Sequence, residues 1–300
     1  MIDISIIIVN YNVRDYLISC IKSIFEQSSN SISIEIIVID NNSSDNSVEF
    51  LKNNFPEIKL IINDKNEGFT KAANLGAKSS KGKYLFILNP DTYFIEDSLS
   101  ILFKLMEKNK NIALLGPAMI SPSKKIQQSY WRKPTLISTL FSLVYLDKMN
   151  RKKNYVNESI NIIKKVETIS GGAFFVRSFI FDLMRGFDQN FFWMEDVDFC
   201  LRISSLGYEV YYTPQTRIVH FQGKSIEKNW SLAIYNQLIS KIKYFNKHHS
   251  TLERIILKIS ILSVSFIKAV ILLILISIRS SFFYRLKGHL KVIKSILFNN

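Results

Sequence analysis

Tyr84–Leu88, with the sequence YLFIL, is followed directly by Asn89, Pro90, Asp91 and Thr92. A short apolar run bounded by turn residues is typical of a strand buried on both faces, as in a parallel sheet. In open α/β sheets, ligands bind at the carboxyl ends of such strands. A carboxylate at that edge can hold a divalent cation against the phosphate groups of a substrate. This stretch therefore predicts an α/β fold with Asp91 at a ligand-binding edge.

Strand and helix patterns alternate around this stretch through the first 116 residues. Apolar runs predict the strands, and apolar residues at helical spacing predict the helices between them. The alternation indicates an α/β fold with a mainly parallel, doubly wound sheet. The expected strands cover residues 4–10, 34–40, 58–62, 84–88 and 112–116, and the expected helices cover 15–27, 70–79, 96–108 and a short segment through Val48 and Leu51 that Asp45 caps.

From Pro117 onward the pattern is less regular. Residues 126–132 and the basic, Asn-rich residues 151–157 are expected to form loops or an insertion. Regular structure is expected again at 166–177, in a helix at 197–206, in a strand at 208–212 and in a long amphipathic helix at 227–246.

The positive charge is concentrated at the C-terminal end of the sequence. The formal net charge is +14, and residues 241–300 contribute +10 of it because they hold 11 Lys and Arg residues and one acid, Glu253. A basic chain could bind nucleic acid, but here the charge lies in the most apolar segment. That combination favours an anionic membrane surface as partner and no nucleic acid.

Residues 255–278 form an apolar run long enough to cross a bilayer, but Lys258 and Lys268 interrupt it. A lysine near the middle of a membrane costs roughly 2.5–3.5 kcal/mol. We therefore expect two membrane-surface helices, one here and one through residues 286–297, whose lysines extend to the lipid headgroups. A helix packed on the protein's own core and a transmembrane span remain the alternatives.

The two cysteines, Cys20 and Cys200, provide no disulfide framework, which favours a reduced, cytosolic protein. The first expected strand begins at Ile4 with no basic segment before it, so we expect no secretory signal.

Polar and glycine residues mark three further places where a ligand could bind. Asp40 ends the second expected strand, where it can accept hydrogen bonds from a pyrimidine or a ribose or simply form a turn. The loop from Asn66 contains Gly68, which suits a left-handed or closely approached backbone position. Gly171 and Gly172 either let the backbone approach a ligand or make a tight entry into a strand.

A second acidic cluster follows an aromatic run and contains Glu195, Asp196 and Asp198. Acids are favoured in the first turn of a helix, but three acids in four positions exceed what capping needs. A carboxylate beside apolar walls can act as a general base near neutrality, and Asp196 is the expected base. His220 alone would more often be structural, but together with Asp91 it becomes a candidate metal ligand.

In their order along the chain, these motifs resemble those of the family-2 glycosyltransferases, and most closely the rhamnosyltransferase-like branch of that family. The resemblance covers residues 3–225. It rests on Val9-Asn10-Tyr11-Asn12, Ile39-Asp40-Asn41-Asn42-Ser43-Ser44-Asp45, Asn66-Glu67-Gly68-Phe69, Leu88-Asn89-Pro90-Asp91-Thr92, Gly171-Gly172-Ala173, Glu195-Asp196-Val197-Asp198 and His220.

The resemblance implies a GT-A fold and an inverting transfer of a sugar, such as rhamnose or another hexose, from a nucleoside-diphosphate donor. Mg²⁺ or Mn²⁺ would be held by Asp91 and His220, while Asp196 would be the base and Glu195 would orient the acceptor. Two departures from the family pattern are that the acidic metal motif keeps a single carboxylate and that Lys71 stands where this branch is expected to have a small residue. The nucleotide sugar would contact Asn10, Tyr11, Asp40, Asn66, Gly68, Asn89 and Asp91, and the acceptor would contact Gly171, Gly172 and Trp193.

The resemblance also implies an organisation and a location. Residues 1–250 would form the GT-A domain, with a donor half at 1–116 and an acceptor half at 117–250. Outside the part that the resemblance covers, the charge and apolar pattern predict a membrane-association segment at 251–300. The acceptor would be a growing glycan or a polyprenyl-phosphate-linked sugar at the cytoplasmic face of the cell membrane.

Two other functions fit the sequence less well. A catalytically silent subunit that binds sugar nucleotides would not need the acids at 195–198. A sugar nucleotidyltransferase needs a glycine-rich phosphate loop after the first strand, and Asn10-Tyr11-Asn12-Val13-Arg14 is not one.

Overall fold

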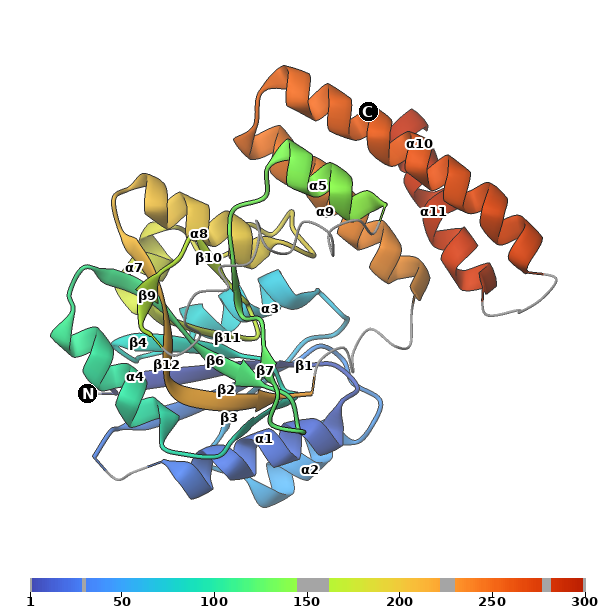
Figure 1. Cartoon of the computed structure of the whole chain (residues 1–300). Coiled ribbons are helices and arrows are strands. Elements are labelled where there is room, and N and C mark those ends of the chain that lie inside the picture. The colour runs from blue at the N-terminus through green and yellow to red at the C-terminus, as the bar shows by residue number, and fades with distance from the viewer. Residues whose placement is uncertain (1, 29–30, 145–161, 222–229, 277–281, 299–300) are drawn as a thin grey trace. The chain divides into compact units, whose positions relative to one another are not determined.

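The computed structural model describes residues 2–28, 31–144, 162–221, 230–276 and 282–298, and Figure 1 shows its elements. The chain divides into two compact units. The first unit comprises Met1–Lys133, Asn157–Gln189 and Glu195–Ser225, and the second comprises Pro134–Val156, Asn190–Met194 and Ile226–Asn300. The expected loop at 151–157 lies outside the described residues.

The sheet of the first unit has the strand order β3-β2-β1-β4-β11-β6-β12-β5 along its main path. Four of the expected strands, β1 (Ile4–Asn10), β2 (Ile34–Asp40), β3 (Lys59–Ile62) and β4 (Tyr84–Leu88), form its parallel half. β11 (Ala173–Arg177) lies antiparallel between β4 and β6 (Ile112–Ile120). The mainly parallel sheet is confirmed, and β11 is the reversed strand inside it.

Helices cover both faces of this sheet. One face packs against α1 (Arg14–Gln27), α2 (Ser47–Asn54) and α4 (Ser98–Lys108), through apolar positions such as Leu51 and Leu102. The other face packs against α3 (Phe69–Lys78), α7 (Ser178–Leu183) and α8 (Glu195–Ser205). Phe174 of β11 contacts Phe199 of α8, and a side chain added at Gly76 of α3 would meet Ile7 and Ile39.

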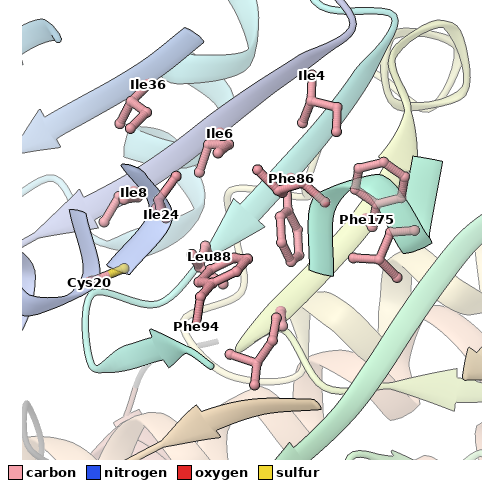
Figure 2. Packing of buried hydrophobic residues seen from close by; sticks show 14 of the residues in the cluster. Ile4, Ile6, Ile8, Cys20, Ile24, Ile36, Phe86, Leu88, Phe94 and Phe175 are labelled. Atoms are coloured by element: carbon pink, nitrogen blue, oxygen red, sulfur yellow. The ribbon is translucent and has the colours of Figure 1, made fainter. Parts of the chain in front are cut away.

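Figure 2 shows the first of these faces. Ile4, Ile6 and Ile8 are fully buried and alternate along β1 toward Cys20 and Ile24 of α1. The intervening Ile7 is also fully buried because the other face of the sheet is covered as well. This double burial explains why the strands read as continuous apolar runs.

Two strands extend further than the sequence pattern predicted. β6 continues four residues past Gly116 to Ile120, and β12 (Glu209–His220) continues past Tyr212 through Pro214. The register between β12 and β6 shifts between Thr213 and Arg217, so the proline lies in an irregularity where no ladder hydrogen bond is required of it. β12 then pairs antiparallel with β5 (Thr92–Phe94), and His220 lies opposite Thr92.

Four short strands lie outside the regular pattern. Residues 126–132, expected as a loop, contain β7 (Ile126–Gln127) and β8 (Tyr130–Trp131). β8 pairs with β10 (Thr168–Ile169), and β9 (Lys164–Lys165) pairs with β12. Two-residue strands carry too little periodicity to be predicted.

The described part of the second unit contains α5 (Leu136–Leu143), α9 (Trp230–His248), α10 (Thr251–Leu275) and α11 (Phe282–Phe298). α10 packs against the other three and begins with a capping box between Ser250 and Glu253. Among the described helices, α10 alone is long and apolar enough to cross a membrane, by length and composition.

One prediction about α10 is wrong. Lys268 does not extend outward to headgroups, because its Nζ donates a hydrogen bond of 2.8 Å to the carbonyl of Leu143, the last residue of α5. The carbonyls of a final helical turn lack partners within their own helix, so an ammonium group satisfies one here.

Candidate active site

β4 and β12 bring Asp91 and His220 together at one edge of the sheet. The pairing of His220 with Thr92 places its ring beside Asp91, with His220 Nε2 3.3 Å from Asp91 Oδ1. The amide of Phe221 donates to the carbonyl of Asp91 over 3.0 Å, which fixes the two chain segments against each other. Both side chains are nearly buried.

The other ring nitrogen of this histidine, His220 Nδ1, is buried and has no hydrogen-bond partner within the described residues. The backbone of His220 is held by Gln127, whose Nε2 donates a hydrogen bond of 2.9 Å to the carbonyl of His220. The sequence analysis missed Gln127, since nothing local distinguishes a glutamine in a two-residue strand from one in a loop.

The donor set fits a hard divalent cation that takes its remaining ligands from a diphosphate. Asp91 supplies a carboxylate and His220 an imidazole, and the carboxylate is the oxygen ligand that Mg²⁺ and Mn²⁺ favour. No group of three His, Cys, Asp or Glu side chains that could enclose a metal occurs within the described ranges. The described residues therefore bring together two side chains that could bind a cation.

Gly172 lies against this pair. Its carbonyl accepts a hydrogen bond of 3.0 Å from the amide of Asn89. A Cβ at Gly172 would lie 3.3 Å from His220 Cε1 and 3.4 Å from Asn89 Nδ2, closer than most real Cβ contacts. Because β11 runs antiparallel to β4, the start of β11 meets the carboxyl end of β4 at the same edge.

The neighbouring glycine holds the acidic cluster. The amide of Gly171 donates to Asp196 Oδ2 over 2.8 Å, and the amide of Val197 donates to Asp196 Oδ1 over 2.7 Å. Burial raises the pKa of the Asp196 carboxyl, and these two hydrogen bonds oppose that rise. Asp196 is thus oriented by backbone amides and kept poorly hydrated.

Glu195, the residue before it, has a less satisfied carboxylate. Its Oε2 is buried with no hydrogen-bond partner in the described structure. Burial, followed by the adjacent charge of Asp196, raises the pKa of Glu195 to about 8. Two carboxyls with raised pKa values at the start of α8 are typical of a functional site.

The third acid of the cluster has a structural role. Asp198 is fully buried and pairs with Arg202 Nε over 2.8 Å. The guanidinium also donates to the carbonyls of Met184 and Gly186 over 2.7 and 2.9 Å. Asp198 therefore anchors α8 to the segment that follows α7.

Asp40 and Asn10 face each other at the ends of β2 and β1. Asp40 is fully buried, and its Oδ2 accepts 2.7 Å from Asn10 Nδ2 while its Oδ1 accepts 2.8 Å from the amide of Ser43. Asn10 Oδ1 is buried without a partner in the part of the chain that is described. Tyr11, the next residue, is exposed.

The loop before α3 is braced by asparagines. Gly68 has φ +82°, which glycine adopts without strain, and its amide donates to Asn66 Oδ1 over 3.0 Å. The carbonyl of Gly68 accepts 3.3 Å from Asn41 Nδ2, which connects this loop to the end of β2. Asn41 was not singled out individually in the sequence, although it follows Asp40 directly.

Hydrogen bonds thus connect most of the expected site residues of the first unit. Asn89, Gly172, Gly171 and Asp196 form one continuous series with Asp91 and His220 beside it. Asn10, Asp40, Asn66 and Gly68 form a second series through Asn41 and Ser43. Trp193 is partly exposed and belongs to the second unit.

Comparison with known proteins identifies the family of this chain. The family model of glycosyl transferase family 2 matches residues 5–182. An uncharacterized glycosyltransferase of Haemophilus influenzae is 30% identical over 109 residues, which cover 36% of each chain. The chain thus spans about a third of that relative's length.

Two similar proteins carry more specific names. The N-acetylglucosaminyl-diphospho-decaprenol L-rhamnosyltransferase of Mycobacterium tuberculosis is 24% identical over 208 residues, 64% of this chain and 68% of the relative. The rhamnosyltransferase WbbL of Escherichia coli is 28% identical over 162 residues, 54% of this chain and 61% of the relative.

Among solved structures, a crystal structure of GalNAc-T7 with UDP, GalNAc and Mn²⁺ is similar, with a TM-score of 0.58 and 18% sequence identity. The match covers 73% of this chain and 43% of the other and shows a common GT-A-like fold. The family match spans more than half of the sequence, so the chain belongs to glycosyl transferase family 2, and it is similar to the two rhamnosyltransferases.

Proposed function

We propose that this protein transfers rhamnose or another hexose from a nucleoside diphosphate to a growing glycan or a polyprenyl-phosphate-linked acceptor, with inversion at the anomeric carbon. The names of the similar rhamnosyltransferases support the sugar class, and the decaprenol-linked substrate named for one of them supports the acceptor class. Inversion is typical of the family.

One observation carries the proposal. The Gly171-Gly172 pair bonds to Asn89 on one side and to Asp196 on the other. The general base is therefore two hydrogen bonds away from the carboxyl end of β4, where a diphosphate would lie.

In the proposed reaction, Asp196 accepts the proton of the acceptor hydroxyl as that oxygen attacks the anomeric carbon. The bond between the anomeric carbon and the diphosphate oxygen breaks in the same displacement, which inverts the configuration. The amides of Gly171 and Val197 keep the carboxylate oriented for this step. Glu195, adjacent and poorly hydrated, would orient the acceptor.

Asp91 and His220 would hold the divalent cation, Mg²⁺ or Mn²⁺. When bound, the cation neutralises the charge that develops on the departing nucleoside diphosphate. The solved structure of similar fold that contains UDP and Mn²⁺ supports the use of a divalent cation. Nδ1 of His220 has no partner within the described ranges, so the ring could form a further hydrogen bond to the substrate.

Donor recognition would involve Asn10, Tyr11, Asp40, Asn66, Gly68 and Asn89. Asp40 would act mainly by shaping the loop, because both its oxygens already accept protein hydrogen bonds. The acceptor would contact Gly171, Gly172 and Trp193. We also propose the division into a donor half at 1–116, an acceptor half at 117–250 and a segment at 251–300 that keeps the enzyme at the cytoplasmic face of the membrane.

Calorimetric titration of the full chain with a panel of nucleoside-diphosphate sugars, with and without Mn²⁺ or Mg²⁺, tests the donor site. We expect one donor to bind tightly, and chelation to abolish that binding. No binding of any donor by folded protein would favour a catalytically silent subunit. Transfer of the bound sugar to a polyprenyl-diphosphate-linked acceptor, with the product anomer read by NMR, then tests the reaction.

A further inference from the structure

Helix α10 presents an apolar face to solvent along its length. Leu257, Ile261, Ser265 and Ala269 form its buried side at four-residue spacing. On the opposite side, Leu252 is 68% and Phe266 62% exposed. Successive residues are rotated by about 100° around the helix axis, so six exposed apolar residues lie within an arc of about 60° at the centre of this outer face. They are Leu252, Ile255, Ile259, Phe266, Val270 and Leu273.

The charged side chains of α10 lie away from this face. Arg254 Nε donates to the carbonyl of His249 over 2.9 Å, and Lys268 Nζ donates to the carbonyl of Leu143 over 2.8 Å. Glu253 closes the capping box with Ser250. Lys258 lies about 90° around the helix from the centre of the outer face. α10 therefore has the reverse of the usual pattern for a surface helix, which keeps its polar side outward.

The surrounding charge identifies what covers this face. No acid follows Glu253 in the sequence, and the neighbouring α11 exposes Lys287, Lys291 and Lys294 beside Leu290. A second copy of the chain would bring two segments of net charge +10 together, and they would repel each other. An anionic lipid surface accepts both the apolar face and the lysines.

We propose that α10 lies in the plane of an anionic membrane, with its outer face immersed at the boundary between headgroups and acyl chains and its buried side turned to α5, α9 and α11. At about 1.5 Å per residue, its 25 residues would make an anchor about 37 Å long. If α10 crossed the bilayer, the hydrogen bond from Arg254 to His249 and the hydrogen bond from Lys268 to Leu143 would lie at very different depths. The inference deepens the proposed membrane location but is independent of the donor, the acceptor and the chemistry.

Single cysteines labelled with an environment-sensitive fluorophore test the orientation. The native Cys20 and Cys200 are fully buried, and burial raises the pKa of both thiols, so they should stay unlabelled in the folded protein. Leu252→Cys, Ser263→Cys and Leu273→Cys sample the two ends and the middle of the outer side. Ser204→Cys on the exposed part of α8 is the matched control in the first unit.

With phosphatidylglycerol-containing vesicles, we expect a several-fold increase in emission at the three α10 positions and none at Ser204→Cys. Lipids carrying a quencher at different depths should place all three probes at the same shallow depth. A middle probe much deeper than both ends would overturn the proposal in favour of a span. No response to vesicles, or the same response to raised protein concentration without lipid, would overturn it in favour of a solvated or self-associating face.

A paired charge substitution provides a second readout without labels. Ile259→Glu combined with Val270→Glu should lower the vesicle-bound fraction at least tenfold, because two carboxylates would enter the immersed face. Leu183→Glu, at an apolar residue of α7 that is 55% exposed, should leave the bound fraction unchanged. Equal binding by both variants would contradict the proposal, whereas failure to bind any nucleotide sugar would bear only on the proposed function.

Discussion

The end of β2 and the start of α8 both carry carboxylates at the site, but they are held in opposite ways. Asp40 is fully buried with both oxygens accepting protein hydrogen bonds. Glu195 has a buried oxygen without a partner in the described residues, and the pKa values of Glu195 and Asp196 are raised. A carboxylate whose oxygens both accept protein hydrogen bonds stabilises the conformation of the loop around it. A carboxylate with a buried oxygen that lacks such a bond can still exchange a proton or bind a ligand.

The largest effect should come from removing the reactive carboxylate. Asp196→Asn keeps the shape and removes the base, so kcat should fall by about 10²–10⁴-fold. Donor affinity should stay close to that of the wild type. The melting temperature should fall, because the amide nitrogen of an asparagine cannot accept one of the two backbone hydrogen bonds that Asp196 accepts. Initial-rate assays with calorimetry on the same sample check this, and wild-type turnover would exclude Asp196 as the base.

The next largest effect should come from Asp91→Ala. Metal-dependent binding of the donor should weaken by at least tenfold, because only His220 would remain as a protein ligand. Glu57→Ala removes an exposed acid elsewhere in the first unit and serves as the control. Unchanged donor affinity in the presence and absence of metal would remove Asp91 from the metal site.

Asp40→Ala should affect folding more directly than chemistry. Asn10 Nδ2 and the amide of Ser43 would both lose an acceptor, at a cost of about 1–3 kcal/mol in the free energy of unfolding. Urea denaturation monitored by circular dichroism measures this loss. If the variant unfolds at the wild-type urea concentration while donor binding is lost, Asp40 contacts the nucleotide rather than bracing the loop.

The smallest effect concerns pH. The pKa of Glu195 is about 8 in the folded protein, above its ordinary value of 4.5. The neutral side chain therefore contributes stability that is fully present below pH 4.5 and is lost as the pH rises through 8. Glu195→Gln cannot ionise, and its melting temperature should fall less between pH 5 and pH 9 than that of the wild type, by on the order of a few °C. Parallel melting curves across this range would show that Glu195 ionises freely.

The sequence predicts the parallel half of the sheet well, because strands buried on both faces leave apolar runs that need no tertiary information. It predicts Asp91 as a site candidate because this acid follows a buried strand, and His220 because it could share a metal with Asp91. It predicts Asp196 because three acids in four positions exceed what capping needs. It does not predict how they meet. That depends on the pairing of His220 with Thr92 and on the reversed β11, both of which join segments far apart in the chain.

Two details show where local reasoning fails. Pro214 suggests the end of a strand, yet β12 continues because a register shift accommodates it. Lys268 has the spacing of a lipid-facing residue, yet Leu143 at the end of α5 provides it with a carbonyl. In both cases a partner distant in the sequence outweighs the local preference.

The position of β11 has a consequence for how the chain folds during synthesis. β4 and β6 lie on either side of β11, so the centre of the sheet stays open until residue 177 is available. Until then, two apolar strands have unpaired edges, which are prone to associate with other chains. A fragment that ends at residue 116 would therefore contain the donor-site residues of the first four strands but lack β11, the strand that completes the sheet. Folding of the proposed donor half therefore depends on β11, a strand that belongs to the proposed acceptor half.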